Sequence, residues 1–461
     1  MLRGTSNQVV TCLISLVAPE IIAAATPAHP SVTRGLGSRV GARMPRRCRS
    51  ICGVGVFPLG LFMTQMAHKI VKTSYDGDVV CVEWDGGALA KFDHIWLRDN
   101  CHCSECYYDA TKQRLLNSCS IPDDIAPIKV ESIPNKLTVV WNHEGHQSEY
   151  ECRWLVIHSY NPRQIPVTEK VAGEQEILAR EYWTVKEMEG RLPSVDFSTV
   201  MASTDENEDA IRDWCLKIWK HGFCFIDNVP VDPQETEKLC EKLMYIRPTH
   251  YGGFWDFTSD LSKNDTAYTN IDISSHTDGT YWSDTPGLQL FHLLMHEGTG
   301  GTTSLVDAFH CAEILKKTHP ESFELLTRIP VPAHSAGEEK VCIQPDIPQP
   351  IFKLDANGEL IQVRWNQSDR STMDSWENPL EVVQFYRAIK QWHKIISDPA
   401  NELFYQLRPG QCLIFDNWRC FHSRTEFTGK RRMCGAYINR DDFVSRLKLL
   451  NIGRQPVLDA I

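Results

Sequence analysis

Two histidines and one aspartate have the spacing of a mononuclear metal site. His276 and Asp278 stand two residues apart, so in an extended chain their side chains project to the same side. His422 follows an apolar run at residues 412–415 and a polar turn at 416–418. Two neutral imidazoles and one carboxylate on one face of an iron(II) ion leave three positions open, enough for a chelating co-substrate and dioxygen. The alternative interpretation of the His-x-Asp pair by itself is a buried histidine whose hydrogen bond is supplied by the neighbouring aspartate.

A basic residue nine positions after His422 strengthens the metal-site interpretation. Arg431 stands at the start of a strand-like run, and alternation along it puts Arg431 and Arg432 on opposite faces. A dicarboxylic 2-oxo acid held by iron at one end needs a fixed cation at the other, and a guanidinium grips a carboxylate with two hydrogen bonds. Thr303 offers a hydroxyl donor to the same carboxylate. The alternative interpretation of Arg431 is a solvent-exposed charge beside Lys430.

Aromatic residues form a second chemical group. A quaternary ammonium has no N–H to donate, so electron-rich ring faces are what stabilise it. Ordinary core and edge packing is the competing interpretation, because tyrosine and tryptophan dominate buried contact area in general. The candidate cage residues are Tyr251, Trp255, Tyr268 and Tyr437.

A cysteine cluster near residue 100 predicts a different metal. Three thiolates and one imidazole suit tetrahedral structural zinc, which would stabilise a small β-domain. The alternative is three free thiols with His102 or His143 as bystanders. The predicted zinc ligands are Cys101, Cys103, Cys106 and His146.

The first 66 residues differ in charge from the rest of the chain. They carry seven arginines, no lysine and one acid, about +6, so the formal charge of −11 leaves about −17 for the remainder. This composition is typical of a mitochondrial transit segment, while a secretory signal or a start at Met63 or Met66 remains open, and the cytoplasm is the alternative location. The acidic body argues against nucleic acid and favours a cationic small substrate.

The remaining composition predicts a chain that does not span a membrane and that has no disulfide framework. The most apolar stretch, residues 9–25, is interrupted by Pro19 and Glu20 and is too short for a transmembrane helix. Most of the 17 cysteines stand singly in apolar runs, which suits buried free thiols in a reducing compartment.

Strand and helix patterns then predict how these residues are positioned. Short strands at 79–84, 137–141 and 149–154 indicate a small N-terminal β-domain over 67–160, followed by a linker at 161–193. Residues 194–461 form the predicted catalytic domain. Its predicted helices are 206–221, one after Asp232-Pro233, 309–317 and 379–396, and its predicted strands are 223–229, 287–294, 361–366, 411–415 and 432–438. Mostly strands with flanking helices predict an antiparallel sandwich or barrel.

From about Leu97 to Leu450 the chain resembles the γ-butyrobetaine and trimethyllysine dioxygenase family, and within it the trimethyllysine branch of fungal type. The strings that carry this resemblance are WLRDNC at 96–101, YGGFW at 251–255, DTAYT at 265–269, HTD at 276–278, TGG at 299–301, FDNWR at 415–419 and GAY at 435–437.

The resemblance implies a fold and a reaction. The family fold is a double-stranded β-helix, or jelly roll, behind a small zinc-binding β-domain, and family members tend to form homodimers. The implied reaction is hydroxylation of N6,N6,N6-trimethyllysine at carbon 3, the first step of carnitine biosynthesis, with iron(II), 2-oxoglutarate and ascorbate. Iron would be held by His276, Asp278 and His422, and 2-oxoglutarate by Arg431 and Thr303. The trimethylammonium group would meet the four aromatic residues named above.

Two positions bear on the choice of substrate within the family. An acid at Asp265 suits the α-ammonium group of trimethyllysine, which butyrobetaine lacks, although a turn or strand-edge role is the alternative. The family pattern after His-x-Asp is usually Thr-Thr-Tyr, whereas here it is Gly279-Thr280-Tyr281. The glycine predicts an altered pocket wall. Butyrobetaine dioxygenase is the alternative activity, and a zinc-stabilised interaction module without catalysis is the alternative from another class.

Overall fold

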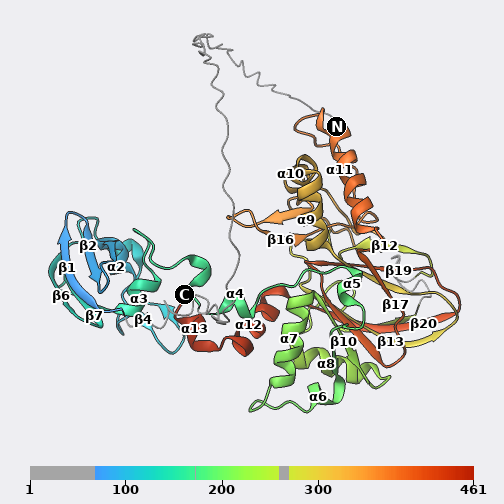
Figure 1. The fold of residues 1–461 in the computed structure, drawn as a ribbon, viewed down its shortest axis with the longest axis horizontal. Helices are drawn as coiled ribbons and strands as arrows, with labels where there is room; N and C mark the ends of the chain where they lie inside the picture. The colour runs from blue at the N-terminus through green and yellow to red at the C-terminus, as the bar shows by residue number, and fades with distance from the viewer. Residues whose placement is uncertain (1–67, 172, 259–268) are drawn as a thin grey trace, which may run out of the picture. The chain divides into compact units, whose positions relative to one another are not determined.

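The computed structural model describes residues 68–171, 173–258 and 269–461 (Figure 1). The predicted targeting segment and the predicted substrate residues Asp265 and Tyr268 lie outside the described residues. None of the helices described there has the length and apolar character of a membrane span. All of the described cysteines are free thiols rather than disulfide partners, and most are buried.

The N-terminal part repeats one motif, a three-stranded antiparallel meander followed by a short helix. In the middle strand of each meander buried and less buried residues alternate, and each ends on a buried tryptophan, Trp84 or Trp141. Both meanders share one apolar core. The elements are β1 (Ile70–Asp76), β2 (Val79–Trp84), β3 (Leu89–Asp93), α2 (His94–Asp99), β6 (Pro127–Ile133), β7 (Lys136–Trp141), β8 (Gln147–Glu151) and α3 (Cys152–Ile157).

The predicted strands in this part are confirmed apart from one boundary. The predicted strand 149–154 ends at Glu151, and residues 152–154 are helical. Helix α3 buries Leu155 and Val156 in the shared core, and this packing requires helical rather than alternating spacing. Between the meanders lie β4 (Tyr107–Tyr108), β5 (Gln113–Arg114) and η1 (Ser118–Ser120).

Residues 161–193 contain only short elements. These are η2 (Val167–Glu169), α4 (Glu174–Ile177) and α5 (Val185–Met188). Helix α5 begins with a reciprocal capping box between Thr184 and Glu187. Trp183, just before it, is buried against Phe223 and thus joins the core of the following sandwich.

The C-terminal part is a sandwich of two mainly antiparallel sheets, as the jelly-roll prediction requires (Figure 1). Apart from the parallel pair β9–β10, the neighbouring strands are antiparallel. One sheet has the order β11 (Trp255–Thr258), β20 (Lys430–Ile438), β13 (Leu288–Glu297), β18 (Gln411–Asp416), β10 (Phe223–Asp227) and β9 (Ser194–Asp196). The other has the order β12 (Ile273–His276), β19 (Cys420–Arg424), β14 (Thr303–Asp307) and β17 (Glu402–Tyr405).

Apolar side chains from both sheets fill the space between them. Phe225 and Phe415 come from the larger sheet, and Leu305 and Leu403 come from the smaller one. Burial on both faces, in the core between the sheets and under the covering helices, explains why the buried part of β18 is a continuous apolar run rather than an alternating one.

Helices cover the outer faces of the two sheets (Figure 1). The larger sheet is packed by α6 (Phe197–Met201), α7 (Asp209–His221), α8 (Pro233–Leu243) and α12 (Arg440–Asn451), with α13 (Arg454–Leu458) after them. The smaller sheet is packed by α9 (Ala308–Thr318), α10 (Pro320–Arg328), α11 (Glu381–Ile396) and the hairpin β15 (Phe352–Leu354) and β16 (Leu360–Val363).

The helix signals in the sequence are confirmed at several ends. Asp232 caps α8 by accepting a hydrogen bond from the Gln234 N–H at 2.9 Å, with Pro233 at the first helical position. Gly222 ends α7 in the left-handed conformation, with φ of +81°. Helices α10 and α12 and strands β12, β14, β17 and β19 were not predicted from the sequence.

Candidate metal centre and active-site cavity

Strand pairing brings the predicted iron ligands together. His276 at the end of β12 and His422 in β19 are cross-strand partners, and their ring centroids lie 4.2 Å apart. Asp278 Oδ1 lies 3.1 Å from His276 Nε2 and 3.7 Å from His422 Nε2. One ligand atom from each residue lies within 4.8 Å of the other two. The three donors therefore face one common point at the edge of the smaller sheet.

Neighbouring groups fix the orientation of two of these donors, His276 and Asp278. His276 Nδ1 lies 2.8 Å from the Ser274 carbonyl, so Nδ1 carries a proton and Nε2 is the ring nitrogen available to a metal ion. Asn417 clamps the backbone of Asp278 on both sides, accepting from its N–H at 2.8 Å and donating to its carbonyl at 3.0 Å. Tyr437 donates to Asp278 Oδ2 at 2.6 Å. The carboxylate is held before any ion binds.

The protonation states also suit a divalent cation. Burial and the nearby His276 lower the pKa of His422 to about 3, so its imidazole is neutral. Burial raises the pKa of Asp278, but His422 and His276 outweigh it and the net pKa is lowered. For His276, burial is outweighed by the hydrogen bond and charge of Asp278, and the net pKa is raised. A metal ion displaces that proton readily, since ligands bind metals in their deprotonated forms.

Arg431 lies in the wall of a cavity that the three donors also line, of about 130 Å³. Its side chain is buried, at 6 % exposure, and its Nε has no hydrogen-bond partner within the described residues. Burial and the neighbouring Arg424 lower the pKa of Arg431 to about 9. A buried cation without a counter-charge is costly, and no described residue forms an ion pair with Arg431, so this wall of the cavity suits an anionic ligand. Thr303 from β14 lines the same cavity.

The alternation predicted for the last strand is confirmed. Arg431 and Tyr437 line the cavity, whereas Arg432 points away and pairs with Asp256 on β11.

Aromatic rings form another part of the cavity wall. Tyr251, Trp255 and Tyr437 all line the cavity, and the Trp255 and Tyr437 rings are 6.0 Å apart, edge to face. Tyr281 was missed by the sequence analysis. It is buried, lines the cavity, and its hydroxyl lies 3.0 Å from that of Tyr251. The sequence did offer one indication of this role, since Tyr281 stands three residues after the predicted metal ligand Asp278.

Gly279 has a structural reason for being glycine. Its φ is +72°, and an added Cβ would lie 2.3 Å from a ring carbon of Trp282. Trp282 in turn contacts the rings of Tyr251, Tyr281 and Tyr437. Because Gly279 has no side chain, the Trp282 indole can pack behind the aromatic wall of the cavity. The sequence predicted only that the glycine alters this wall.

Arg424, Asn366 and Asp369 are among the cavity residues that were not singled out from the sequence. Arg424, on β19 with His422, donates to the Thr269 and Ile271 carbonyls at 2.9 and 2.7 Å. Asn366 and Asp369 follow β16 and also line the cavity. Only Arg424 had a local signal, because it stands two residues after His422 and shares its strand face.

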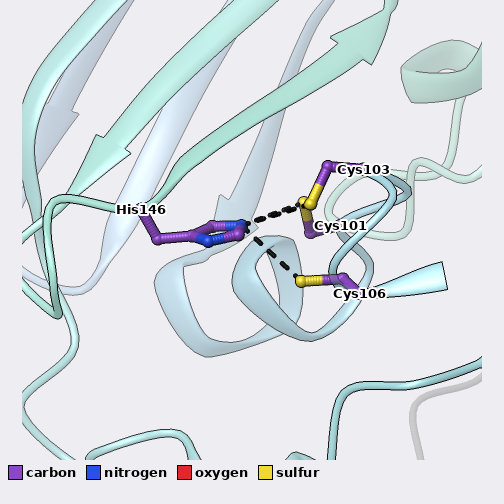
Figure 2. Close-up of side chains that lie close together, drawn as sticks. All are labelled: Cys101, Cys103, Cys106 and His146. Atoms are coloured by element: carbon purple, nitrogen blue, oxygen red, sulfur yellow. Dashed lines mark hydrogen bonds between the residues drawn. The ribbon is translucent and has the colours of Figure 1, made fainter.

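The predicted zinc ligands also lie together (Figure 2). The three sulfurs surround one ring nitrogen of His146, with Nε2 at 3.4 Å from Cys101 Sγ and 3.6 Å from both Cys103 Sγ and Cys106 Sγ (Figure 2). Arg98 donates to Cys106 Sγ at 3.2 Å. His102 instead packs on the Tyr107 and Trp154 rings. The donor set and convergence fit tetrahedral zinc, and Arg98 offsets the excess thiolate charge.

Two protein-family models match the chain. Residues 184–437 match the taurine catabolism dioxygenase TauD, TfdA family, and residues 71–156 match the gamma-butyrobetaine hydroxylase-like N-terminal model. The first match covers the sandwich with both histidines and Asp278. The second covers the two meanders and the cysteine cluster.

Curated relatives agree with these matches. The chain is 94% identical over 399 residues to trimethyllysine dioxygenase from Meyerozyma guilliermondii, covering 87% of this chain and 100% of that protein. It is 36% identical over 368 residues to the mitochondrial trimethyllysine dioxygenase of Homo sapiens, covering 79% and 84%. It is 29% identical over 381 residues to gamma-butyrobetaine dioxygenase from a Pseudomonas species, covering 80% and 93%. The chain belongs to the trimethyllysine dioxygenase family, within the TauD and TfdA group of dioxygenases.

Proposed function

We propose that the chain hydroxylates N6,N6,N6-trimethyl-L-lysine at carbon 3, the first step of carnitine biosynthesis. One oxygen atom of O₂ enters the new hydroxyl group and the other enters succinate, as 2-oxoglutarate loses CO₂. The observation that carries the proposal is the single cavity lined by His276, Asp278, His422 and Arg431 together with several aromatic rings. A zinc-stabilised interaction module would not need a buried guanidinium, without an ion-pair partner among the described residues, in the same cavity as three convergent metal donors.

In this proposal His276, Asp278 and His422 hold iron(II). When bound, the iron supplies the redox chemistry that couples decarboxylation of the keto acid to C–H hydroxylation. Arg431 grips the far carboxylate of 2-oxoglutarate, and Thr303 donates a hydroxyl hydrogen bond to it. Burial of Arg431 strengthens this contact because the attraction between opposite charges is larger where the local dielectric constant is low. Ascorbate assists turnover by keeping the iron reduced.

The substrate's trimethylammonium group meets the faces of Tyr251, Trp255 and Tyr437. The Tyr437 hydroxyl is bonded to Asp278, so this residue supports the metal ligand and presents its ring to the cavity. Tyr268 and Asp265, outside the described residues, complete the substrate site in this proposal: one as a fourth ring, the other as an acid that distinguishes trimethyllysine from butyrobetaine.

The remaining assignments concern the whole chain. Residues 1–66 are a mitochondrial targeting segment in this proposal, supported by their arginine content and by mammalian relatives named mitochondrial. Residues 67–160 form a zinc-stabilised domain held by Cys101, Cys103, Cys106 and His146, residues 161–193 form a linker, and residues 194–461 form the catalytic domain. The enzyme works as a homodimer on a small-molecule substrate.

A direct assay tests the activity. Purified protein is incubated in air with iron(II), 2-oxoglutarate, ascorbate and trimethyllysine, and mass spectrometry follows the gain of one oxygen. Butyrobetaine is run in parallel, because a 29% identical relative is named for it. We expect hydroxylated trimethyllysine with matching succinate. Preferential hydroxylation of butyrobetaine would assign the other branch, and oxidation of neither would overturn the proposal.

A further inference from the structure

We propose that Arg364 is a positioning residue for substrate selection: it holds the loop that carries Tyr281 and Trp282, and with it the aromatic wall of the cavity. Arg364 follows β16 directly and is not itself one of the residues that line the cavity. The inference rests on the proposed function, because that function assigns the aromatic wall to the trimethylammonium group.

The loop that carries these rings lacks the hydrogen bonds of regular secondary structure. Residues 279–286, between β12 and β13, belong to no helix or strand, so their backbone carbonyls need donors from elsewhere. Three of them accept hydrogen bonds from the Arg364 guanidinium: Trp282 at 2.8 Å, Thr280 at 3.1 Å and Ser283 at 3.2 Å. One side chain therefore replaces part of the ladder that a paired strand would provide.

The shape and charge of arginine suit this task. A planar guanidinium presents several N–H donors at once, whereas the single nitrogen of a lysine cannot reach carbonyls spread over residues 280–283. Arg364 is buried, at 7 % exposure, and the hydrogen bonds of its guanidinium go to this loop. Burial lowers the pKa of Arg364 to about 10, so the guanidinium is still charged at neutral pH. Charged donors make stronger hydrogen bonds than neutral ones, so the loop is held firmly.

The two rings on the loop contact the rest of the aromatic wall. The Tyr281 hydroxyl lies 3.0 Å from that of Tyr251, and the Trp282 ring lies edge to face with that of Tyr437, with the centroids 5.9 Å apart. A second guanidinium, that of Arg247, lies 5.6 Å from the centre of the Trp282 ring. A displaced loop would therefore disturb rings that come from other segments of the chain.

The backbone beside Arg364 is anchored between the metal donors. The Thr277 N–H donates to the Trp365 carbonyl at 2.8 Å, and the Trp365 N–H donates to Thr277 Oγ1 at 3.0 Å. Thr277 stands between His276 and Asp278 in the chain. Arg364 thus places the aromatic wall relative to the metal donors. Because the trimethylammonium group rests on the wall while the reacting carbon lies at the metal, this spacing selects the carbon that is hydroxylated.

Binding measurements separate this role from a general loss of structure. Under argon, with iron(II) present, calorimetry gives the dissociation constant for 2-oxoglutarate and then, with 2-oxoglutarate added, that for trimethyllysine. We expect Arg364→Gln to weaken trimethyllysine binding about 10-fold, because the wall is no longer held in place. Binding of 2-oxoglutarate should be little changed, since Arg431 and Thr303 lie on β20 and β14. Arg364→Lys, which keeps the charge and one donor nitrogen, should lie between wild type and Arg364→Gln.

The position of the new hydroxyl group gives a second readout. Mass spectrometry with fragmentation locates it in the product. Wild type should hydroxylate carbon 3, whereas Arg364→Gln should also give product at a neighbouring carbon and succinate in excess of product. The control is Arg191→Gln, which changes an exposed arginine that donates to the Glu187 carbonyl at 2.7 Å and does not line the cavity. That variant should match wild type in both ligand constants and in the product.

Thermal unfolding is measured for every variant, and Arg364→Lys decides by the same comparison if Arg364→Gln does not fold. Equal weakening of both ligands would reduce Arg364 to a structural role and overturn the inference. Unchanged trimethyllysine binding together with product at carbon 3 alone would overturn it as well. Failure of the proposed function is a separate result, because it appears as absence of hydroxylated trimethyllysine in the wild type.

Discussion

Two of the three proposed metal donors, His276 and Asp278, are held in place by neighbouring groups. The Ser274 carbonyl selects the tautomer of His276, and Asn417 and Tyr437 hold Asp278. Such partners preorganise a site, so that binding an ion does not require the side chains to be ordered first. The same logic applies to Arg431, whose guanidinium is held in a buried wall before a carboxylate arrives.

Asp278→Ala should abolish succinate formation, because the site loses its only anionic donor for iron. Succinate is measured with and without trimethyllysine, and iron binding is measured separately by calorimetry. Asp346→Ala, an exposed acid elsewhere, should behave as wild type. Substantial residual turnover in a folded Asp278→Ala protein would mean that the ligand assignment is wrong.

Arg431→Lys should raise the KM for 2-oxoglutarate about 10- to 100-fold, since an ammonium cannot replace the two-point grip of a guanidinium. The control is Arg432→Lys, which changes the neighbouring residue on the opposite strand face, where it pairs with Asp256. That variant should keep a wild-type KM. Equal effects of the two substitutions would show that general surface charge, not a fixed contact, draws in the co-substrate.

At the scale of elements, the site depends on how the strands meet. β12 and β19 pair so that His276 faces His422, and the chain then turns through Gly279 into the segment that carries Tyr281 and Trp282. The turn needs a left-handed residue, and its lack of a side chain admits Trp282 behind the aromatic wall. Backbone conformation and pocket shape are therefore set by the same residue.

Gly279→Ala should lower the free energy of unfolding by more than Gly358→Ala does. Both glycines have positive φ, +72° and +81°, so both substitutions carry backbone strain of about 1–2 kcal/mol. Only at Gly279 would the new Cβ clash, with Trp282. Urea denaturation compares the two variants. We also expect a higher KM for trimethyllysine in Gly279→Ala alone; equal stability losses and an unchanged KM would contradict this role.

At the scale of the whole molecule, the net charge and the candidate metal sites differ from one part of the chain to another. The first 66 residues are basic and the remainder is strongly acidic, which favours attraction of a cationic amino acid to the catalytic part. The two meanders share one core with the cysteine cluster beside it, so zinc bound there, as proposed, would reinforce a small apolar core.

Removing zinc should lower the thermal unfolding temperature of the protein. Metal analysis should find about one zinc per chain, and chelation should reverse its stabilising effect. Cys106→Ser should mimic chelation because it removes a donor, whereas Cys81→Ser, in β2 of the same part, should retain zinc. A protein without zinc, or an unchanged unfolding temperature after chelation, would assign the cluster to free thiols.

The sequence alone was sufficient to predict the features that depend on residues close together in the chain. Residue type named the donors, two-residue spacing put His276 beside Asp278, and strand alternation separated Arg431 from Arg432. Capping and glycine signals at Asp232 and Gly222 marked helix ends, because each acts through hydrogen bonds or φ values of the nearest residues.

Tertiary structure decided what depends on residues far apart in the chain. Three features follow from strand register and helix packing: the pairing of His276 with His422, the burial of Arg431 Nε without a hydrogen-bond partner among the described residues, and the position of Asp369 at the cavity. Strand register is selected by the faces that the two sheets bury together, and here the paired strands come from segments far apart in the sequence. For this reason the donors could be named from the sequence, while the cavity they share required the fold.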